Sequence, residues 1–139
     1  MVDDDTAILW YYIHIAMAKK KAQLFHSADG YNRVARVYDK KLSHLNSFEK
    51  GKLMPLIGDV HGLAILDVGA GTGRLATQLA KSGANVTACD ISEKMLEVLK
   101  KKNPSIITVV GDAEGLPFEN NTFDIVIAGF LIVHLKTPR

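Results

Sequence analysis

Ala64-Ile-Leu-Asp-Val-Gly-Ala-Gly-Thr-Gly-Arg-Leu-Ala76 is the stretch of the sequence that decides the fold. Ala64–Val68 is an apolar run of strand length, and Arg74–Lys81 has the leucine spacing of a helix. Between them lie three glycines at alternate positions, Gly69, Gly71 and Gly73. Because a strand that turns so tightly into a helix needs backbone without Cβ clashes, we expect a glycine loop with free N–H groups where a ligand approaches. The stretch predicts a nucleotide-type ligand.

The glycine spacing also distinguishes between nucleotides. The dinucleotide fingerprint is Gly-x-Gly-x-x-Gly, and here Arg74 stands at its third glycine. The Gly-Lys-Ser/Thr of a phosphate-binding P-loop is absent from the sequence. Asp67, at the end of the first strand, would repel a pyrophosphate but can accept hydrogen bonds from an ammonium or a loop N–H. The pattern favours a ligand with a cationic amino-acid group, and an NAD-dependent reductase is the less favoured alternative.

Three further strands are predicted after the glycine loop: Asn85–Asp90, Ile106–Val110 and Phe123–Ala128. The last is a nearly continuous apolar run, as expected for a strand buried on both faces. Asp90 ends its strand where a doubly wound fold places an acidic residue that binds a ribose, and its two oxygens can accept from both hydroxyls of a diol. Ser92 is expected to cap the next helix.

These motifs resemble the class I S-adenosylmethionine-dependent methyltransferases, in particular the small-molecule type 11 group that includes ubiquinone and menaquinone biosynthesis enzymes. Asp67-Val-Gly-Ala-Gly-Thr-Gly73 matches the first motif of that family in full. Leu116-Pro-Phe118 and the residues after it resemble the family's bridge into the fourth strand. The resemblance runs from about Tyr31 to Leu135 and implies an α/β fold. We expect a Rossmann-like doubly wound sheet, truncated to about four parallel strands in the order 3-2-1-4, with N-terminal helices.

The resemblance implies S-adenosyl-L-methionine as cofactor and a small molecule as methyl acceptor. It places the following residues at the cofactor: Tyr31, Tyr38, Asp67, Gly69, Ala70, Gly71, Asp90, Ile91, Met95, Asp112, Ala113 and Ala128. Asp90 is assigned to the ribose hydroxyls, Ile91 to the adenine face, and Asp112 with Ala113 to the adenine-reading turn. For Met95, core packing is an open alternative. We assign no catalytic residue and no metal ligand, since a structural helix histidine explains His134 better than a base does.

The N-terminal part is predicted to hold two helices with a break at Ala28-Asp-Gly30. Residues 1–28 contain an apolar helix that packs on the domain or on a partner chain, with contact to a membrane surface as the alternative. Residues 29–139 form the partial methyltransferase domain. The second helix places Tyr31 and Tyr38 on one face. It resembles the family's Tyr-Asp-x-x-Ala-x-x-Tyr-Asp segment, which closes over the cofactor, although Asn32 replaces the usual aspartate.

Composition limits the partners. The chain has 139 residues and a formal net charge of +2, which fits a single domain without a need for nucleic acid or membrane. The N-terminal apolar run is about a dozen residues, too short for a transmembrane segment, which takes about 20. Cys89 is the single cysteine and is expected to be a small buried side chain. A chain without an intramolecular disulfide fits a reducing compartment, so we predict a cytoplasmic protein.

The resemblance ends at the helix after the fourth strand, whereas the family's sheet has seven strands in the order 3-2-1-4-5-7-6. The fourth strand is therefore predicted to be a flat apolar edge that pairs with something. We expect a homo-oligomer, formed through this edge or through the N-terminal helix. A separate polypeptide that supplies the remaining strands and a truncated gene are the alternatives. The main functional hypothesis is methyl transfer, and the second is a cofactor-binding or interaction module that is inactive by itself, as a fragment or one subunit of a split enzyme.

Overall fold

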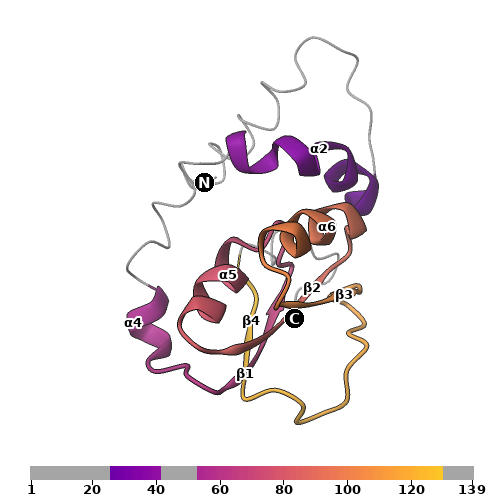
Figure 1. The fold of residues 1–139 in the computed structure, drawn as a ribbon. Coiled ribbons are helices and arrows are strands. Elements are labelled where there is room, and N and C mark those ends of the chain that lie inside the picture. The colour runs from indigo at the N-terminus through magenta and orange to yellow at the C-terminus, as the bar shows by residue number, and fades with distance from the viewer. Residues whose placement is uncertain (1–25, 42–52, 130–139) are drawn as a thin grey trace, which may run out of the picture.

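The computed structural model describes residues 26–41 and 53–129 of the chain. Four strands form one parallel sheet in the order β3-β2-β1-β4 (Figure 1). They are β1 (Ala64–Val68), β2 (Asn85–Asp90), β3 (Ile107–Val110) and β4 (Ile125–Ile127). The order and the parallel pairing confirm the predicted Rossmann-like sheet. The predictions on the N-terminal apolar helix and on His134 lie outside the described residues.

The helices are α2 (Ser27–Lys41), α4 (Leu53–Ile57), α5 (Arg74–Lys81) and α6 (Glu93–Lys102). α5 has the predicted bounds, and α6 begins at the predicted cap, because the Ser92 hydroxyl accepts a hydrogen bond from the Met95 N–H at 3.2 Å. α2 lies along α6 on the side away from the sheet (Figure 1). Within residues 26–41 and 53–129, no helix is long and apolar enough to cross a membrane.

The register of the sheet brings the ends of the strands together. β1 is central and pairs with β2 from Ala64 opposite Asn85 to Val68 opposite Cys89. β2 pairs in turn with β3, with Asp90 opposite Val110. Because all strands are parallel, the segments that follow β1, β2 and β3 emerge at one edge of the sheet, where ligands of open α/β sheets bind.

The two faces of the sheet are covered differently. On one face a hydrophobic core forms between the strands and α4, α5 and α6, with these fully buried side chains at its centre: Ile65, Leu79, Ala88, Leu99 and Ile106. On the other face Leu66, Val68 and Cys89 are covered by Ala113, Leu116, Phe118 and Phe123 of the segment between β3 and β4. An irregular segment therefore covers this face of the sheet, whereas helices cover the first face. Cys89 is 1% exposed, as predicted for a small core residue.

Two predicted strand boundaries need correction. β3 begins at Ile107, since Ile106 is buried in the core at 1% exposure before the strand starts. β4 is limited to Ile125–Ile127. It is not buried on both faces in the described part of the chain, because Val126 is 58% exposed. The continuous apolar run predicted burial on both faces, but only one face of β4, with Ile125 and Ile127, packs against the helical core.

The predicted break at Ala28-Asp-Gly30 is wrong. α2 begins at Ser27 and continues through Gly30, whose N–H donates to the carbonyl oxygen of His26 at 3.0 Å. A single glycine lowers helix propensity by about 1 kcal/mol, and α2 stays helical through it where it packs on α6. The predicted boundary between residues 28 and 29 therefore falls inside a helix.

Gly73 fixes the distance between the glycine loop and α6. It is the N-cap of α5 in the left-handed region, with φ of 81°. A Cβ at this position would lie 2.0 Å from Cδ1 of Leu99 in α6. Gly73 therefore allows the close helix packing that the third glycine of a dinucleotide fingerprint provides, one residue earlier than in that fingerprint.

We expect Gly73→Ala to lower the free energy of unfolding by about 2–4 kcal/mol, because it combines a left-handed φ with overpacking against Leu99. Gly115→Ala is the matched control, since a Cβ there has open space and its φ is not positive. Urea unfolding followed by circular dichroism measures both. Equal stability of the two variants would contradict this account of the packing.

Candidate functional site

The candidate site lies at the carboxyl edge of the sheet, where three segments meet. The glycine loop, residues 69–73, is joined to β2 by two hydrogen bonds, from the N–H groups of Gly69 and Ala70 to the carbonyl oxygen of Cys89, at 2.8 and 3.1 Å. The turn after β3 is joined to the end of β2 by a bond from Gly111 N–H to the carbonyl oxygen of Asp90, at 3.0 Å. The end of β2 therefore holds both neighbouring segments.

Asp90 connects these segments through its side chain as well. Its Oδ2 accepts from the Gly71 N–H and its Oδ1 from the Ser92 N–H, each at 2.8 Å. A carboxylate has about four acceptor positions, so two backbone bonds do not by themselves exhaust it. Asp90 is half-buried at the end of β2. The position and acceptor capacity of this side chain remain compatible with the predicted binding of a ribose diol.

The prediction of free N–H groups in the glycine loop is wrong for four of its residues. Gly69, Ala70 and Gly71 donate to Cys89 and Asp90, and the Gly73 N–H donates to the carbonyl oxygen of Ala70 at 2.9 Å. Buried backbone donors need partners, and the end of β2 supplies them within the protein. What the loop offers instead is space: Gly71 has φ of 55°, and a Cβ there would meet nothing within 4 Å.

Two tyrosines of α2 lie beside this edge. The rings of Tyr31 and Tyr38 are in edge-to-face contact, with centroids 6.1 Å apart and planes at 67°. Burial raises the pKa of both phenols, and the charge of Asp90 raises each further. For Tyr38 the Arg74 guanidinium acts in the opposite direction. Tyr31 and Tyr38 thus lie on one face of α2, as the sequence predicts, and their contact with a cofactor stays a prediction.

The other predicted residues differ in the surface that they present. Ile91 is 39% exposed and therefore has an apolar surface next to Asp90. Asp112 is exposed, and its Oδ1 accepts from the Glu114 N–H at 3.0 Å in a tight turn. Ala113 is half-buried against the second core face, and Ala128 is exposed just after β4.

Met95 and Asp67 are the two predicted contacts that lie in the interior. Met95 is 1% exposed, so core packing is the better supported of its two predicted roles. Asp67 is 2% exposed within β1, between Ala88 of β2 and Ile127 of β4. Its cofactor contact stays a prediction, as does that of Met95.

A polar network that the sequence analysis did not predict joins α2 to the site. Asn32 accepts from the Ser92 hydroxyl, and Asp39 accepts from the hydroxyl of Thr72 in the glycine loop. Lys102 at the end of α6 pairs with Asp39. The signal in the sequence was the repeated pattern of a tyrosine followed by Asn or Asp, which we interpreted only through its aromatic residues.

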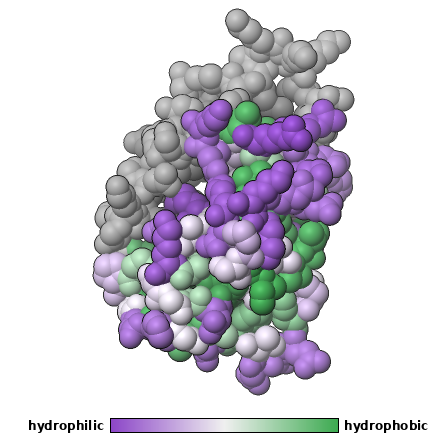
Figure 2. Space-filling view, viewed as in Figure 1, coloured by the Kyte–Doolittle hydropathy of each residue, from purple (hydrophilic) through white to green (hydrophobic). Residues whose placement is uncertain are grey.

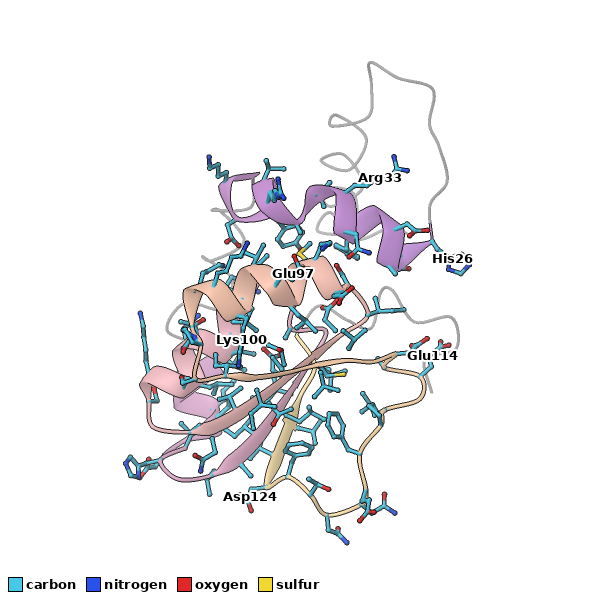
Figure 3. The ribbon with its side chains drawn as sticks, turned by 45° about the vertical axis from the view of Figure 1, so that its right-hand side comes forward. His26, Arg33, Glu97, Lys100, Glu114 and Asp124 are labelled. Atoms are coloured by element: carbon cyan, nitrogen blue, oxygen red, sulfur yellow. The ribbon has the colours of Figure 1, made fainter. Side chains whose placement is uncertain are left out.

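Asp124 marks the opposite end of the sheet, at the start of β4 (Figure 3). Its Oδ2 accepts from the Ala64 N–H, and its own N–H donates to the carbonyl oxygen of Ala64, both at 2.8 Å. Asp124 therefore aligns the starts of β4 and β1 and belongs to the fold rather than to the site.

Comparison with known proteins identifies the family. Residues 65–139, more than half of the chain, match the family described as methyltransferase domain, and the chain belongs to this family. The demethylmenaquinone methyltransferase of Staphylococcus aureus strain MRSA252 is 39% identical in an alignment of 125 positions that covers 82% of this chain and 52% of that protein. The corresponding enzyme of Renibacterium salmoninarum is 41% identical over 83 residues, 60% of this chain and 35% of that protein.

The fold is shared with solved methyltransferases. A S-adenosylmethionine-dependent methyltransferase from Aquifex aeolicus superposes with a TM-score of 0.65 at 24% identity, over 77% of this chain and 61% of that one. The predicted resemblance to the class I methyltransferases is thus confirmed. The chain spans about half or less of the length of the two curated relatives above.

Gly71→Ala is expected to weaken binding of S-adenosylhomocysteine more than tenfold, because its methyl group would occupy the open space over the glycine loop. Gly58→Ala is the matched control, since Gly58 also has a positive φ and open space but lies outside the site. Each variant should lose about 1–2 kcal/mol of stability from the left-handed φ. Calorimetric titration measures the affinity, and equal affinities of the two variants would remove Gly71 from the site.

Proposed function

We propose that the chain binds S-adenosyl-L-methionine at the carboxyl edge of its sheet and takes part in methyl transfer to a small molecule. The observation that carries the proposal is the position of Asp90. Its carboxylate stands at the end of β2 and holds the glycine loop through Gly71, and its charge raises the pKa of both tyrosines of α2. The names of the curated relatives suggest an acceptor that resembles demethylmenaquinone.

The residues present fit this cofactor. Asp90 supplies acceptors for ribose hydroxyls, and the exposed side chain of Ile91 supplies an apolar surface for the adenine. Open space over Gly71 allows a ligand to approach the backbone closely. The aromatic rings of Tyr31 and Tyr38 suit a sulfonium cation, which an aromatic face attracts.

In this proposal the protein acts by binding and orientation. The bound cofactor supplies an activated methyl group on its sulfonium. Asp90 and the glycine loop hold the nucleoside, while α2 excludes water with its tyrosines. Holding two reactants in line accelerates such a displacement without a nucleophile of the protein, so the proposal names no catalytic residue.

A second candidate is a cofactor-binding module that does not transfer methyl groups by itself. The share of the curated relatives that the chain matches, 52% and 35%, favours this alternative. Both candidates predict cofactor binding, and only the first predicts turnover of an acceptor by the isolated chain. Methyl transfer from labelled cofactor to a demethylmenaquinone analogue separates them.

Asp90→Asn is expected to reduce the affinity for S-adenosylmethionine and S-adenosylhomocysteine about 10- to 100-fold, because hydrogen bonds to a charged group contribute about 1.5–3 kcal/mol. Asp124→Asn is the control, since Asp124 also binds a backbone N–H but lies at the other end of the sheet. Calorimetry of the wild-type chain with both ligands and NAD tests the cofactor. Binding of NAD alone would reject the proposal.

The proposal includes association of two copies through β4. Among the described strands β4 pairs only with β1, and its Val126 is 58% exposed. An apolar edge of this kind favours pairing with another strand. A cytoplasmic location is also part of the proposal and rests on the single cysteine.

Val126→Lys is expected to convert the dimer into a monomer, because a lysine on an edge strand opposes pairing. Ile107→Lys on β3, the opposite edge, is the control, since Ile107 is 60% exposed and lies on the other side of the sheet. Light scattering after size-exclusion chromatography gives the mass. A monomeric wild-type chain would contradict the association.

A further inference from the structure

α2 is attached to the domain with little apolar contact. Of residues 27–40, only Ala35 is buried, while Val34 and Val37 are 38% and 41% exposed. Among the described residues, neither hydrophobic cluster of the sheet contains a side chain of α2. Figure 2 shows that the surface over α2 and α6 is largely hydrophilic. The half-buried rings of Tyr31 and Tyr38 are its largest apolar contribution. Segments with few buried apolar contacts separate from a domain at low free energy, so polar contacts contribute to holding α2 in place.

The first polar contact joins the C-terminal part of α2 to the glycine loop. Asp39 Oδ1 accepts from the hydroxyl of Thr72 at 2.5 Å, and Asp39 Oδ2 pairs with Lys102 Nζ at 2.5 Å. Lys102 also donates to the carbonyl oxygen of Thr72 at 2.9 Å. Burial opposes the charge of Asp39, but hydrogen bonds from Lys102 and Thr72 outweigh it and lower the pKa of Asp39, so this group is a carboxylate at neutral pH.

Thr72 makes this contact specific to the site. It is 3% exposed and lies between Gly71 and Gly73 in the glycine loop. The pair of Asp39 with Lys102 is itself partly exposed and would contribute little alone. The bond from the buried Thr72 hydroxyl is the part that fixes α2 relative to the loop.

The second polar contact joins the N-terminal part of α2 to the start of α6. Asn32 Oδ1 accepts from the Ser92 hydroxyl at 2.7 Å and from the Lys94 N–H at 3.1 Å. Ser92 is fully buried, and its own N–H donates to Asp90. Asn32 is therefore linked through Ser92 to the carboxylate of Asp90, the candidate ribose-binding group.

The α2 residue that makes each contact directly follows one of the two tyrosines in the sequence. Asn32 follows Tyr31 and Asp39 follows Tyr38, seven residues or about two helical turns apart. We propose that Asn32 and Asp39 are positioning residues that clamp α2 at two points over the cofactor edge, hold both tyrosine rings beside Asp90, and thereby set the affinity for the cofactor. This inference rests on the proposed function and extends it to residues that do not contact the ligand.

The test uses the full chain with both clamps removed, as Asn32→Ala with Asp39→Ala. Hydrogen exchange without ligand should show amides of α2 exchanging at least about tenfold faster, with amides of β1 and β2 unchanged. Affinity for S-adenosylhomocysteine should fall about tenfold or more. If Asp39→Asn replaces Asp39→Ala in the double variant, part of the protection of α2 and part of the affinity should return, because an amide oxygen still accepts a hydrogen bond from the Thr72 hydroxyl. Asp29→Ala, which removes an exposed carboxylate of the same helix, should change neither.

Three results would overturn the inference. Unchanged exchange of α2 in the double variant would show that the clamps do not hold the helix. Faster exchange of α2 together with unchanged affinity for S-adenosylhomocysteine would show that Asn32 and Asp39 do not position the site. Faster exchange throughout the sheet would make these residues general determinants of the fold. If the wild-type chain does not bind S-adenosylhomocysteine, the proposed function fails and the positioning role with it, while the exchange of the ligand-free chain still decides whether the clamps hold α2.

Discussion

The carboxylate of Asp90 accepts one hydrogen bond from the glycine loop and one from the residue that caps α6. Through these two bonds, the end of one strand determines where the next helix starts and where the neighbouring loop turns. The carbonyl oxygens of Cys89 and Asp90 extend the same control to the glycine loop and to the turn after β3. A cofactor that binds Asp90 therefore binds the group on which the local geometry depends.

Packing beneath this edge explains why the loop has its glycines. Gly73 brings the loop within contact distance of Leu99, and Gly71 leaves its surroundings open. Gly73 is thus required by the packing of the interior, whereas at Gly71 the left-handed φ of 55° favours glycine. α2 adds the remaining wall of the site, and it does so with polar contacts, because its apolar face has almost no core to enter.

The sequence was sufficient for the sheet order, for β1, β2 and α5, and for the placing of Tyr31 and Tyr38 on one face of α2. The strands and the helix follow from local patterns, namely strand-length apolar runs, helical spacing and glycines at a turn, whereas the order of the sheet came from the resemblance to the methyltransferase family. The shortened β4 and the continuous α2 were not predictable in this way, because the exposure of Val126 and the support of Gly30 come from neighbours distant in sequence. The same holds for the clamp of Asp39 on Thr72, since nothing local indicates which hydroxyl an exposed carboxylate will bind. Assignments such as Met95, Asp112 and Ala128 rest on the resemblance and await a bound ligand.

The uneven covering of the sheet has a chemical consequence. Cys89 lies under the irregular segment that covers the second face, and a Cβ on Gly111 would come within 2.9 Å of its sulfur. Burial, together with the charge of Asp90, raises the pKa of this thiol and suppresses its reactive thiolate. An alkylating reagent can therefore reach Cys89 only when residues 111–118 lift from the sheet. The single sulfhydryl of the chain is a built-in probe, and its alkylation rate measures how often the segment that covers this face of the sheet opens to solvent.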